Sequence, residues 1–275
     1  MATVMIRHSD LPAEPPPSLA QDHALLCDAV RVAGQVALGY YRGKNVVREK
    51  KPGDPVSEAD LAVDAELKRW LAGARPDYGW MSEETADTPA RLDAARVWVV
   101  DPIDGTKGFI AGNDEYALSA ALVEKGRPVA AAIYNPSTGE FFEAMLGGGA
   151  RLNGFDIRAT AKTTTRGLKL GTSRNELRRN LWVDLFPEAE VIALDAIAYK
   201  LAMVAAGRFD GVISLRAKSD WDIAAGDLLV YEAGGVITDL EGGVLRYNQP
   251  VTRHPNLVAS GSVIFSALRA RLAKR

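Results

Sequence analysis

The residues best suited to chemistry form an acidic turn at the end of an apolar run. Residues 97–100, Val-Trp-Val-Val, predict a strand, and residues 101–106, Asp-Pro-Ile-Asp-Gly-Thr, follow it directly. Mg²⁺ is usually held by a few carboxylates together with water and phosphate oxygens. Asp101 and Asp104, separated by a proline-fixed turn, suit that role. An acidic turn that merely caps a helix has the same composition, so this segment alone identifies no reaction.

The end of this turn has the features of an anion site. Gly105 permits close approach of the backbone, and a helix that begins at Thr106 would direct free amide groups at a phosphate. Lys107 follows, either as a substrate ligand or as an exposed helix lysine. The turn therefore predicts that a metal ion and a phosphate bind next to each other.

Two further acidic groups lie at the ends of predicted elements. Glu83 and Glu84 follow the short apolar run 78–81. One glutamate could bind a metal and position a water, whereas Glu84 is interpreted as a solvated loop residue. Asp222 precedes the helical run 223–233, where aspartate is also a preferred N-cap. Capping and metal binding are compatible, because a carboxylate offers about four acceptor directions.

Helices and strands must position these groups. In the first half, apolar periodicity predicts a helix from Ser18 with Gly43 as its C-cap. Ser57, with Asp60 at the third helical position, predicts a capping box and a second helix to about Leu71. Short apolar runs between Gly, Pro and Asn turns indicate a largely antiparallel sheet. The strands predicted in this half are residues 45–49, 97–100, 116–123, 128–134 and 140–145.

The second half alternates between strands and helices, which is typical of an α/β arrangement. Strands are predicted at 167–171, 211–215 and 235–238, with helices at 196–206 and 222–233. We expect three regions: a flexible N-terminal extension over residues 1–18, an α+β domain with most metal ligands over 19–152, and an α/β domain that completes a cleft over 153–275.

Composition excludes several classes of function. The net charge is -2 and the pI about 6.0, which gives no basic footprint for a nucleic acid polymer or an anionic membrane. Cys27 is the single cysteine, so no internal disulfide can form, and a cytoplasmic location is expected. The scattered histidines His8, His23 and His254 lack the spacing of a zinc site. No apolar stretch has the length of a membrane span.

Four separated motifs occur together in the order found in the inositol monophosphatase family. They are Gly-Asp-Pro-Val-Ser-Glu-Ala-Asp at 53–60, Glu-Glu at 83–84, the segment 101–106, and Trp-Asp at 221–222 with Gly-Gly at 234–235. A chance coincidence of four motifs is far rarer than that of one. The chain therefore resembles that family over about residues 20–262.

The resemblance implies both a fold and an activity. The fold is a layered αβαβα sandwich of the inositol monophosphatase and fructose-1,6-bisphosphatase type, with the site in a cleft between the two halves. The activity is that of a lithium-sensitive phosphoric monoester hydrolase with two to three Mg²⁺ per active site. Family members commonly form homodimers, and we expect one here.

The resemblance also assigns roles to single residues. Glu83, Asp101 and the carbonyl of Ile103 correspond to the ligands of a first Mg²⁺. Asp101, Asp104 and Asp222 correspond to those of a second, so Asp101 bridges the two ions.

The remaining catalytic residues act on the water. Asp60 and Thr106 correspond to the pair that orients and deprotonates the attacking water beside Glu83. The implied reaction is in-line attack of an activated water on phosphorus without a covalent phosphoenzyme.

The substrate is less tightly specified by the motifs. Inositol-specific members carry a glutamate six residues before the Trp of Trp-Asp, where this chain has Leu215. Lys107 and the stretch 171–174, Gly-Thr-Ser-Arg, are more similar to 3'(2'),5'-bisphosphate nucleotidases, although Asn175-Glu176 departs from their pattern. Arg174 could pair with a second phosphate or lie on the surface.

A bisphosphate nucleotidase is accordingly the preferred interpretation, and the alternatives are an inositol-1-monophosphatase, a histidinol-phosphate phosphatase or a sugar phosphatase. Asp195 and Lys200 either shape the pocket or cap the nearby helix. The expected substrate-binding residues are Asp104, Gly105, Thr106, Lys107, Ser173, Arg174 and Lys200.

Two hypotheses from other classes remain open. A catalytically silent, metal-dependent binding protein would retain the fold, but the intact ligand set argues against it. A two-metal phosphodiesterase or nuclease is disfavoured because no basic groove is indicated. The expected partner is a small phosphorylated metabolite.

Overall fold

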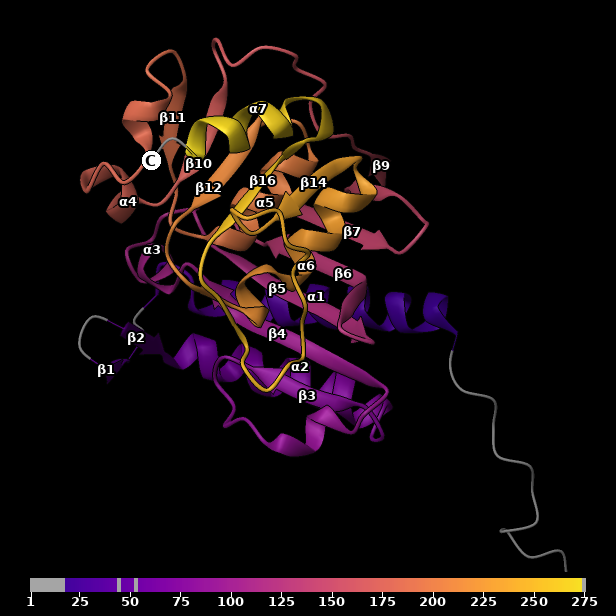
Figure 1. Ribbon diagram of the computed structural model, residues 1–275. Helices are drawn as coiled ribbons and strands as arrows, with labels where there is room; N and C mark the ends of the chain where they lie inside the picture. Colours follow the sequence, from indigo (N-terminus) through magenta and orange to yellow (C-terminus); the bar gives the residue numbers. More distant parts are fainter. Residues whose placement is uncertain (1–17, 44–45, 52–53, 274–275) are drawn as a thin grey trace, which may run out of the picture.

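A computed structural model of the protein describes residues 18–43, 46–51 and 54–273. Residues 1–17 of the predicted extension and Gly53 of the first motif lie outside this described part. The described chain forms five stacked layers, helix, sheet, helix, sheet and helix, as Figure 1 shows. The predicted αβαβα sandwich is therefore confirmed.

The larger sheet has seven strands in the order β3-β4-β5-β6-β7-β8-β9. β3 and β4 are parallel, and the other neighbouring pairs are antiparallel. The strands are β3 (Gly79–Ser82), β4 (Arg96–Asp104), β5 (Ala117–Glu124), β6 (Arg127–Asn135), β7 (Glu140–Met145), β8 (Ala150–Leu152) and β9 (Phe155–Asp156).

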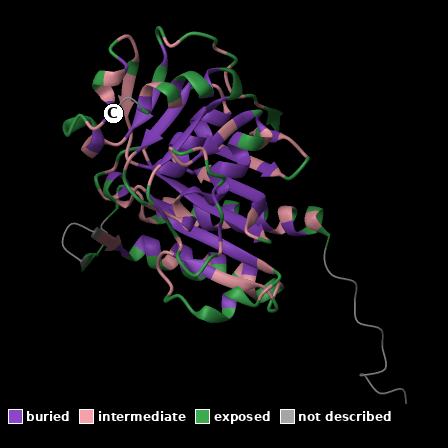
Figure 2. Cartoon of the chain, viewed as in Figure 1, coloured by how far each residue is buried: buried purple, intermediate pink, exposed green. Residues whose placement is uncertain are grey.

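Both faces of this sheet are covered, which explains its apolar strands. Trp98 and Leu118 face α1 (Leu19–Tyr40) and α2 (Glu58–Ala74). Alternate residues such as Val99 face α5 (Ile197–Ala205) and α6 (Asp220–Glu232). Figure 2 shows the buried residues concentrated through these central layers.

The smaller sheet has the order β11-β10-β12-β16-β14 and lies beyond α5 and α6. Helix α7 (Ser262–Leu272) covers its outer face, where Ile213 and Val258 pack against Ile264 and Leu268. The strands are β10 (Lys169–Thr172), β11 (Glu190–Ala193), β12 (Gly211–Ser214), β14 (Gly235–Thr238) and β16 (Leu257–Gly261).

Short elements complete the described fold. They are the hairpin β1 (Val47–Lys51) and β2 (Asp54–Ser57), the pair β13 (Lys218–Ser219) and β15 (Arg253–His254), helices α3 (Thr106–Ile110) and α4 (Arg174–Arg178), and 3₁₀ turns η2 (Pro89–Leu92) and η3 (Val183–Leu185). Among the described helices, none has the length and apolar character needed to cross a membrane.

The predicted end of the first helix was wrong. α1 ends at Tyr40, its C-cap is Tyr41 and not Gly43, and Arg42 adopts the left-handed conformation (φ 56°). The reason is tertiary, because the Tyr41 ring packs on Tyr116 and its hydroxyl donates a hydrogen bond to the Gly112 carbonyl.

Helix α7 was not predicted from the sequence. Ile264, Phe265, Leu268 and Leu272 have helical spacing, and all four are buried. This apolar periodicity was present in the sequence and could have identified the helix.

Candidate metal centre

The acidic turn and the Glu83 loop meet because β3 and β4 are parallel. Ser82, the last residue of β3, pairs with Val100, and the next residue of β4 is Asp101; β4 itself continues along β5 to Asp104. The Glu83 amide donates a hydrogen bond to the Val100 carbonyl at 3.2 Å, which places Glu83 beside Asp101. The parallel direction of β3 and β4 therefore brings the first two carboxylates of the site together.

Three carboxylates converge at this edge. Glu83, Asp101 and Asp222 each contribute an oxygen, and these oxygens lie within 4.8 Å of one another. Asp101 is 1% exposed, so its charge is almost wholly withdrawn from water. Clustered hard oxygen donors of this kind fit a divalent cation such as Mg²⁺.

The first turns of two helices hold the carboxylates of Asp60 and Asp222 in place. Asp60 and Asp222 are each the third residue of a helix, α2 and α6, and each accepts a hydrogen bond from the amide of its N-cap serine. The Ser57 amide lies 2.8 Å from Asp60 Oδ2, and the Ser219 amide lies 2.7 Å from Asp222 Oδ2. Both helices thus position a carboxylate through a capping box.

Asp104 connects the two halves of the molecule. Its Oδ2 accepts a hydrogen bond from the Ala198 amide at 2.6 Å, in the first turn of α5. The N-cap of α5 is Ala196, which has no side-chain acceptor, so Asp104 supplies that acceptor from β4. The nearby charge of Asp222 acts on the same carboxylate and contributes to its raised pKa.

Thr106 is held by two acceptors. Its Oγ1 lies 3.0 Å from Asp60 Oδ1 and 3.0 Å from the Ile103 carbonyl. A hydroxyl has one proton, so it donates to one of these acceptors at a time. The predicted catalytic pair Asp60 and Thr106 is therefore in direct contact.

All five predicted metal ligands line one cavity of about 300 Å³. The lining residues are Pro55, Glu83, Asp101, Ile103, Asp104, Gly105, Thr106, Lys107, Asp195, Lys218 and Asp222. A second cavity of about 500 Å³ shares Lys107, Asp195 and Lys218 with it, so the two adjoin.

Burial and mutual repulsion favour the protonated carboxylates when no cation is present. Burial and the neighbouring Glu83 charge raise the pKa of Asp101 well above its ordinary value. Burial, with Asp222 beside it, raises the pKa of Asp104 to about 7. Burial also raises the pKa values of Glu83 and Asp222. A divalent cation would relieve this cost by neutralising the ionised carboxylates.

Lys50 contacts the site and was not predicted from the sequence to do so. From the β1–β2 hairpin its Nζ reaches Glu83 Oε1 at 2.9 Å and Glu84 Oε1 at 2.5 Å. Glu84 is consequently buried, with 5% of its side chain exposed, and is not the solvated loop residue that was predicted. The charged sequence of β1 was the only sign of this pairing, because the contact forms only when the hairpin packs next to the Glu83 loop.

The predicted substrate residues lie in different places. Lys107, Ser173 and Arg174 line the second cavity. Arg174 pairs with Glu115 at 2.5 Å and with Asp195 at 3.0 Å. Asp195 thus binds Arg174 and does not cap α5.

Lys200 lies beneath the site and is 2% exposed. Its Nζ donates a hydrogen bond to the Leu194 carbonyl at 2.5 Å, and it does not line either of the two cavities. Burial, with Lys218 nearby, lowers its pKa to about 8.

Comparisons with known proteins agree with this geometry. A model described as the inositol monophosphatase family matches residues 19–275. An inositol-1-monophosphatase of Rhizobium meliloti (strain 1021) is 39% identical over 202 residues, which are 70% of this chain and 75% of that protein. The Nus factor SuhB of Escherichia coli (strain K12) is 33% identical over 254 residues, 89% of this chain and 92% of that protein.

A solved structure has the same fold. The extragenic suppressor protein SuhB from Bartonella henselae superposes with a TM-score of 0.81 at 32% identity, covering 91% of this chain and 98% of that one. The five layers and the carboxylate centre define a metal-dependent phosphatase. The chain belongs to the inositol monophosphatase family and is a phosphoric monoester hydrolase.

Proposed function

We propose that this protein uses Mg²⁺ to hydrolyse a small phosphomonoester that carries a second anionic group, with a 3'(2'),5'-nucleoside bisphosphate as the first candidate. The observation that supports it is the cavity adjoining the metal centre. That cavity is lined by five basic side chains and one acidic side chain: Lys107, Arg174, Arg178, Arg216, Lys218 and Asp195. Basic side chains in a partly enclosed site favour a phosphate.

In this proposal the metal ligands are Glu83, Asp101, Asp104, Asp222 and the Ile103 carbonyl, which together hold two to three Mg²⁺. Bound Mg²⁺ supplies positive charge that stabilises the phosphoryl oxygens and the leaving group. Gly105 and Thr106 line the same cavity and are proposed to contact the reacting phosphate.

Asp60 and Thr106 are proposed to handle the proton of the attacking water. When the Thr106 hydroxyl donates to Asp60, the lone pairs of Oγ1 are available to accept a hydrogen bond from water. Glu83, on the neighbouring strand exit, would fix the second side of that water. Lys200 is proposed to act through its charge near Asp104, because the ammonium is directed at backbone carbonyls.

Inositol monophosphate is the second candidate, and the names of relatives such as the Rhizobium meliloti protein favour it. The Leu215 amide donates to Glu176 at 2.6 Å, and its side chain packs against the outer apolar core. Arg216, the next residue, lines the basic cavity. This local arrangement supports an anionic group over ring hydroxyls at the second position.

Turnover measured in parallel on four compounds tests the proposal. The compounds are adenosine 3',5'-bisphosphate, inositol 1-phosphate, histidinol phosphate and fructose 1,6-bisphosphate, each with Mg²⁺. The bisphosphates should be hydrolysed fastest, and Arg216→Gln should raise KM for them more than for inositol 1-phosphate. Greatest activity on inositol 1-phosphate would overturn the second-anion proposal, whereas inactivity throughout would support a silent binding protein.

The expected homodimer also remains a proposal, supported by family membership. Light scattering coupled to size-exclusion chromatography tests it directly, and a monomeric mass would contradict it.

A further inference from the structure

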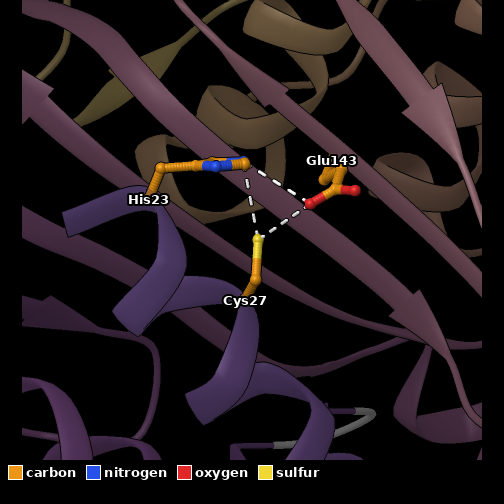
Figure 3. A group of neighbouring side chains, drawn as sticks. All are labelled: His23, Cys27 and Glu143. Atoms are coloured by element: carbon orange, nitrogen blue, oxygen red, sulfur yellow. Dashed lines mark hydrogen bonds and ion pairs between the residues drawn. The ribbon is translucent and has the colours of Figure 1, made fainter. Parts of the chain in front are cut away.

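Three side chains with different donor atoms meet away from the catalytic centre. His23 and Cys27 lie one helical turn apart on α1, and Glu143 projects toward them from β7 (Figure 3). Cys27 Sγ lies 3.5 Å from His23 Nε2 and 3.2 Å from Glu143 Oε2. His23 Nε2 lies 3.7 Å from the same carboxylate oxygen. One nitrogen, one sulfur and one oxygen therefore form a closed triangle.

The triangle lies beside the apolar residues that α1 and the seven-stranded sheet bury between them. Glu143 is two residues from Phe141, so both side chains point toward α1, where Leu26 and Val30 are fully buried. The side chains of His23 and Glu143 are only 16% and 17% exposed, and Cys27 is 7% exposed. An ionisable carboxylate in this position requires a partner that stabilises its charge.

The dimensions of the triangle fit a tetrahedral zinc ion. Zinc bonds of about 2.3 Å to sulfur and about 2.0–2.2 Å to nitrogen or oxygen separate tetrahedral ligand atoms by roughly 3.4–3.6 Å. The three measured separations lie within a few tenths of an ångström of that range. The three donor atoms are therefore already spaced so that one zinc ion could contact all of them.

The charges fit as well. A thiolate and a carboxylate together balance a divalent cation, and imidazole binds in its neutral form. Nearby basic groups have other contacts: the Arg31 guanidinium stacks 3.6 Å from the Phe141 ring centre, and Arg151 pairs with Asp156 at 3.2 Å. A mixed nitrogen, sulfur and oxygen set selects Zn²⁺ over the Mg²⁺ that an all-oxygen set prefers.

We propose that His23, Cys27 and Glu143 form a Zn²⁺-binding site, with water as the fourth ligand at its partly exposed side. Such a site would join α1 to β7 and is separate from the catalytic carboxylates. Figure 1 places the N-terminal turns of α1 on the right and α3, next to the acidic turn, on the left.

The proposed site does not depend on spacing between histidines. The histidines do lack zinc-site spacing among themselves, but His23 and Cys27 are four residues apart on one helix face. Glu143 completes the set only because α1 packs on the seven-stranded sheet. A hydrogen-bonded cluster that binds no metal is the competing explanation, with the thiol donating to Glu143.

Cobalt provides a specific test because Cys27 is the only cysteine in the chain. Co²⁺ bound to a thiolate has a sulfur-to-metal charge-transfer absorption in the near ultraviolet, which a carboxylate centre cannot produce. Full-length protein, reduced and stripped with EDTA, is titrated with Co²⁺ and then with Zn²⁺. The absorption should saturate at one Co²⁺ per chain, and Zn²⁺ should abolish it.

Matched variants assign the signal to the three ligands. Cys27→Ser should eliminate the absorption and retain Mg²⁺-dependent phosphatase activity, which shows that the variant is folded. His23→Gln and Glu143→Gln should each weaken Co²⁺ binding by at least roughly tenfold, the lower end of the loss for residues that only support a ligand. Asp101→Asn, which alters the catalytic centre, should leave the absorption unchanged.

Two results would overturn the proposal. The first is wild-type protein that gives no thiolate absorption and binds no more Zn²⁺ than Cys27→Ser. The second is an absorption that persists at full affinity in both His23→Gln and Glu143→Gln, because cysteine alone would then account for binding.

Discussion

At the scale of single residues, Asp101 combines a local structural contact with its proposed role as a metal ligand. One oxygen accepts a hydrogen bond from the Ile103 amide at 3.1 Å, which fixes the turn, and the carboxylate also lies in the trio with Glu83 and Asp222. Since asparagine can keep the turn but carries no charge, Asp101→Asn separates these tasks. We expect turnover to fall by more than about 100-fold, because residues that only support a metal ligand already cost about 10- to 100-fold.

Steady-state kinetics with varied Mg²⁺ measure this effect, and circular dichroism checks that the fold is retained. Wild-type turnover in Asp101→Asn would refute its role as a metal ligand.

The hydroxyl of Thr106 can be tested without changing the shape of the side chain. Thr106→Val removes the contact with Asp60 and should lower kcat by roughly 100-fold or more while KM changes little. Thr165→Val is the matched control, because Thr165 also donates to a carboxylate, that of Glu188, but does not line either cavity at the site. Equal losses in the two variants would contradict a catalytic role for Thr106.

At the scale of elements, capping boxes hold carboxylates in place at helix starts. Ser18 caps α1 and Ser57 caps α2, and each forms a capping box with the third helical residue, which is the amide Gln21 in α1 and the carboxylate Asp60 in α2. Replacing either serine with alanine should lower the free energy of unfolding by about 1 kcal/mol. Only Ser57→Ala should also lower kcat, because Ser57 Oγ donates to Asp60 at 2.6 Å.

Chemical denaturation and kinetics of the two variants provide the comparison. A loss of turnover in Ser18→Ala as large as in Ser57→Ala would show that helix stability, and not the position of Asp60, limits the rate.

Much of this site could be predicted because its residues stand at the ends of recognisable elements. Asp101 follows an apolar strand, and the Ser57 and Asp60 pair has a capping signature. The contacts of Lys50 and of Asp104 could not be predicted, because they depend on how a hairpin and a distant helix pack. The same limit applies to Glu143, which is separated from Cys27 by 116 positions.

At the scale of the whole molecule, the buried and clustered carboxylates make stability depend on pH and metal. The pKa values of Asp101, Glu83 and Asp222 are raised, and that of Asp104 is about 7. A raised carboxyl pKa means that the folded state binds protons more tightly than the unfolded chain. The stability contributed by such a carboxyl group is therefore fully present below its pKa in the unfolded chain, about 4. It is lost as the pH rises through the raised pKa of the folded protein.

Metal-free protein should consequently lose thermal stability between about pH 5 and pH 8, and Mg²⁺ should restore most of it at pH 8. Differential scanning calorimetry with EDTA or Mg²⁺ across this range measures both effects. Asp104→Asn should reduce the dependence of the melting temperature on pH in metal-free protein. A melting temperature that rises with pH in EDTA would contradict the raised pKa values.

The parallel pairing of β3 with β4 also determines where the chain can tolerate change. Because Ser82 and Val100 are paired in parallel strands, the residues that follow them, Glu83 and Asp101, lie side by side whatever segment connects the two strands. The connection from Thr85 to Ala95 is therefore not needed to place the proposed metal ligands. It does make other contacts, such as the hydrogen bond from Thr85 to Asp64. Insertions and deletions around η2 should accumulate there in evolution, while Glu83 and Asp101 remain neighbours.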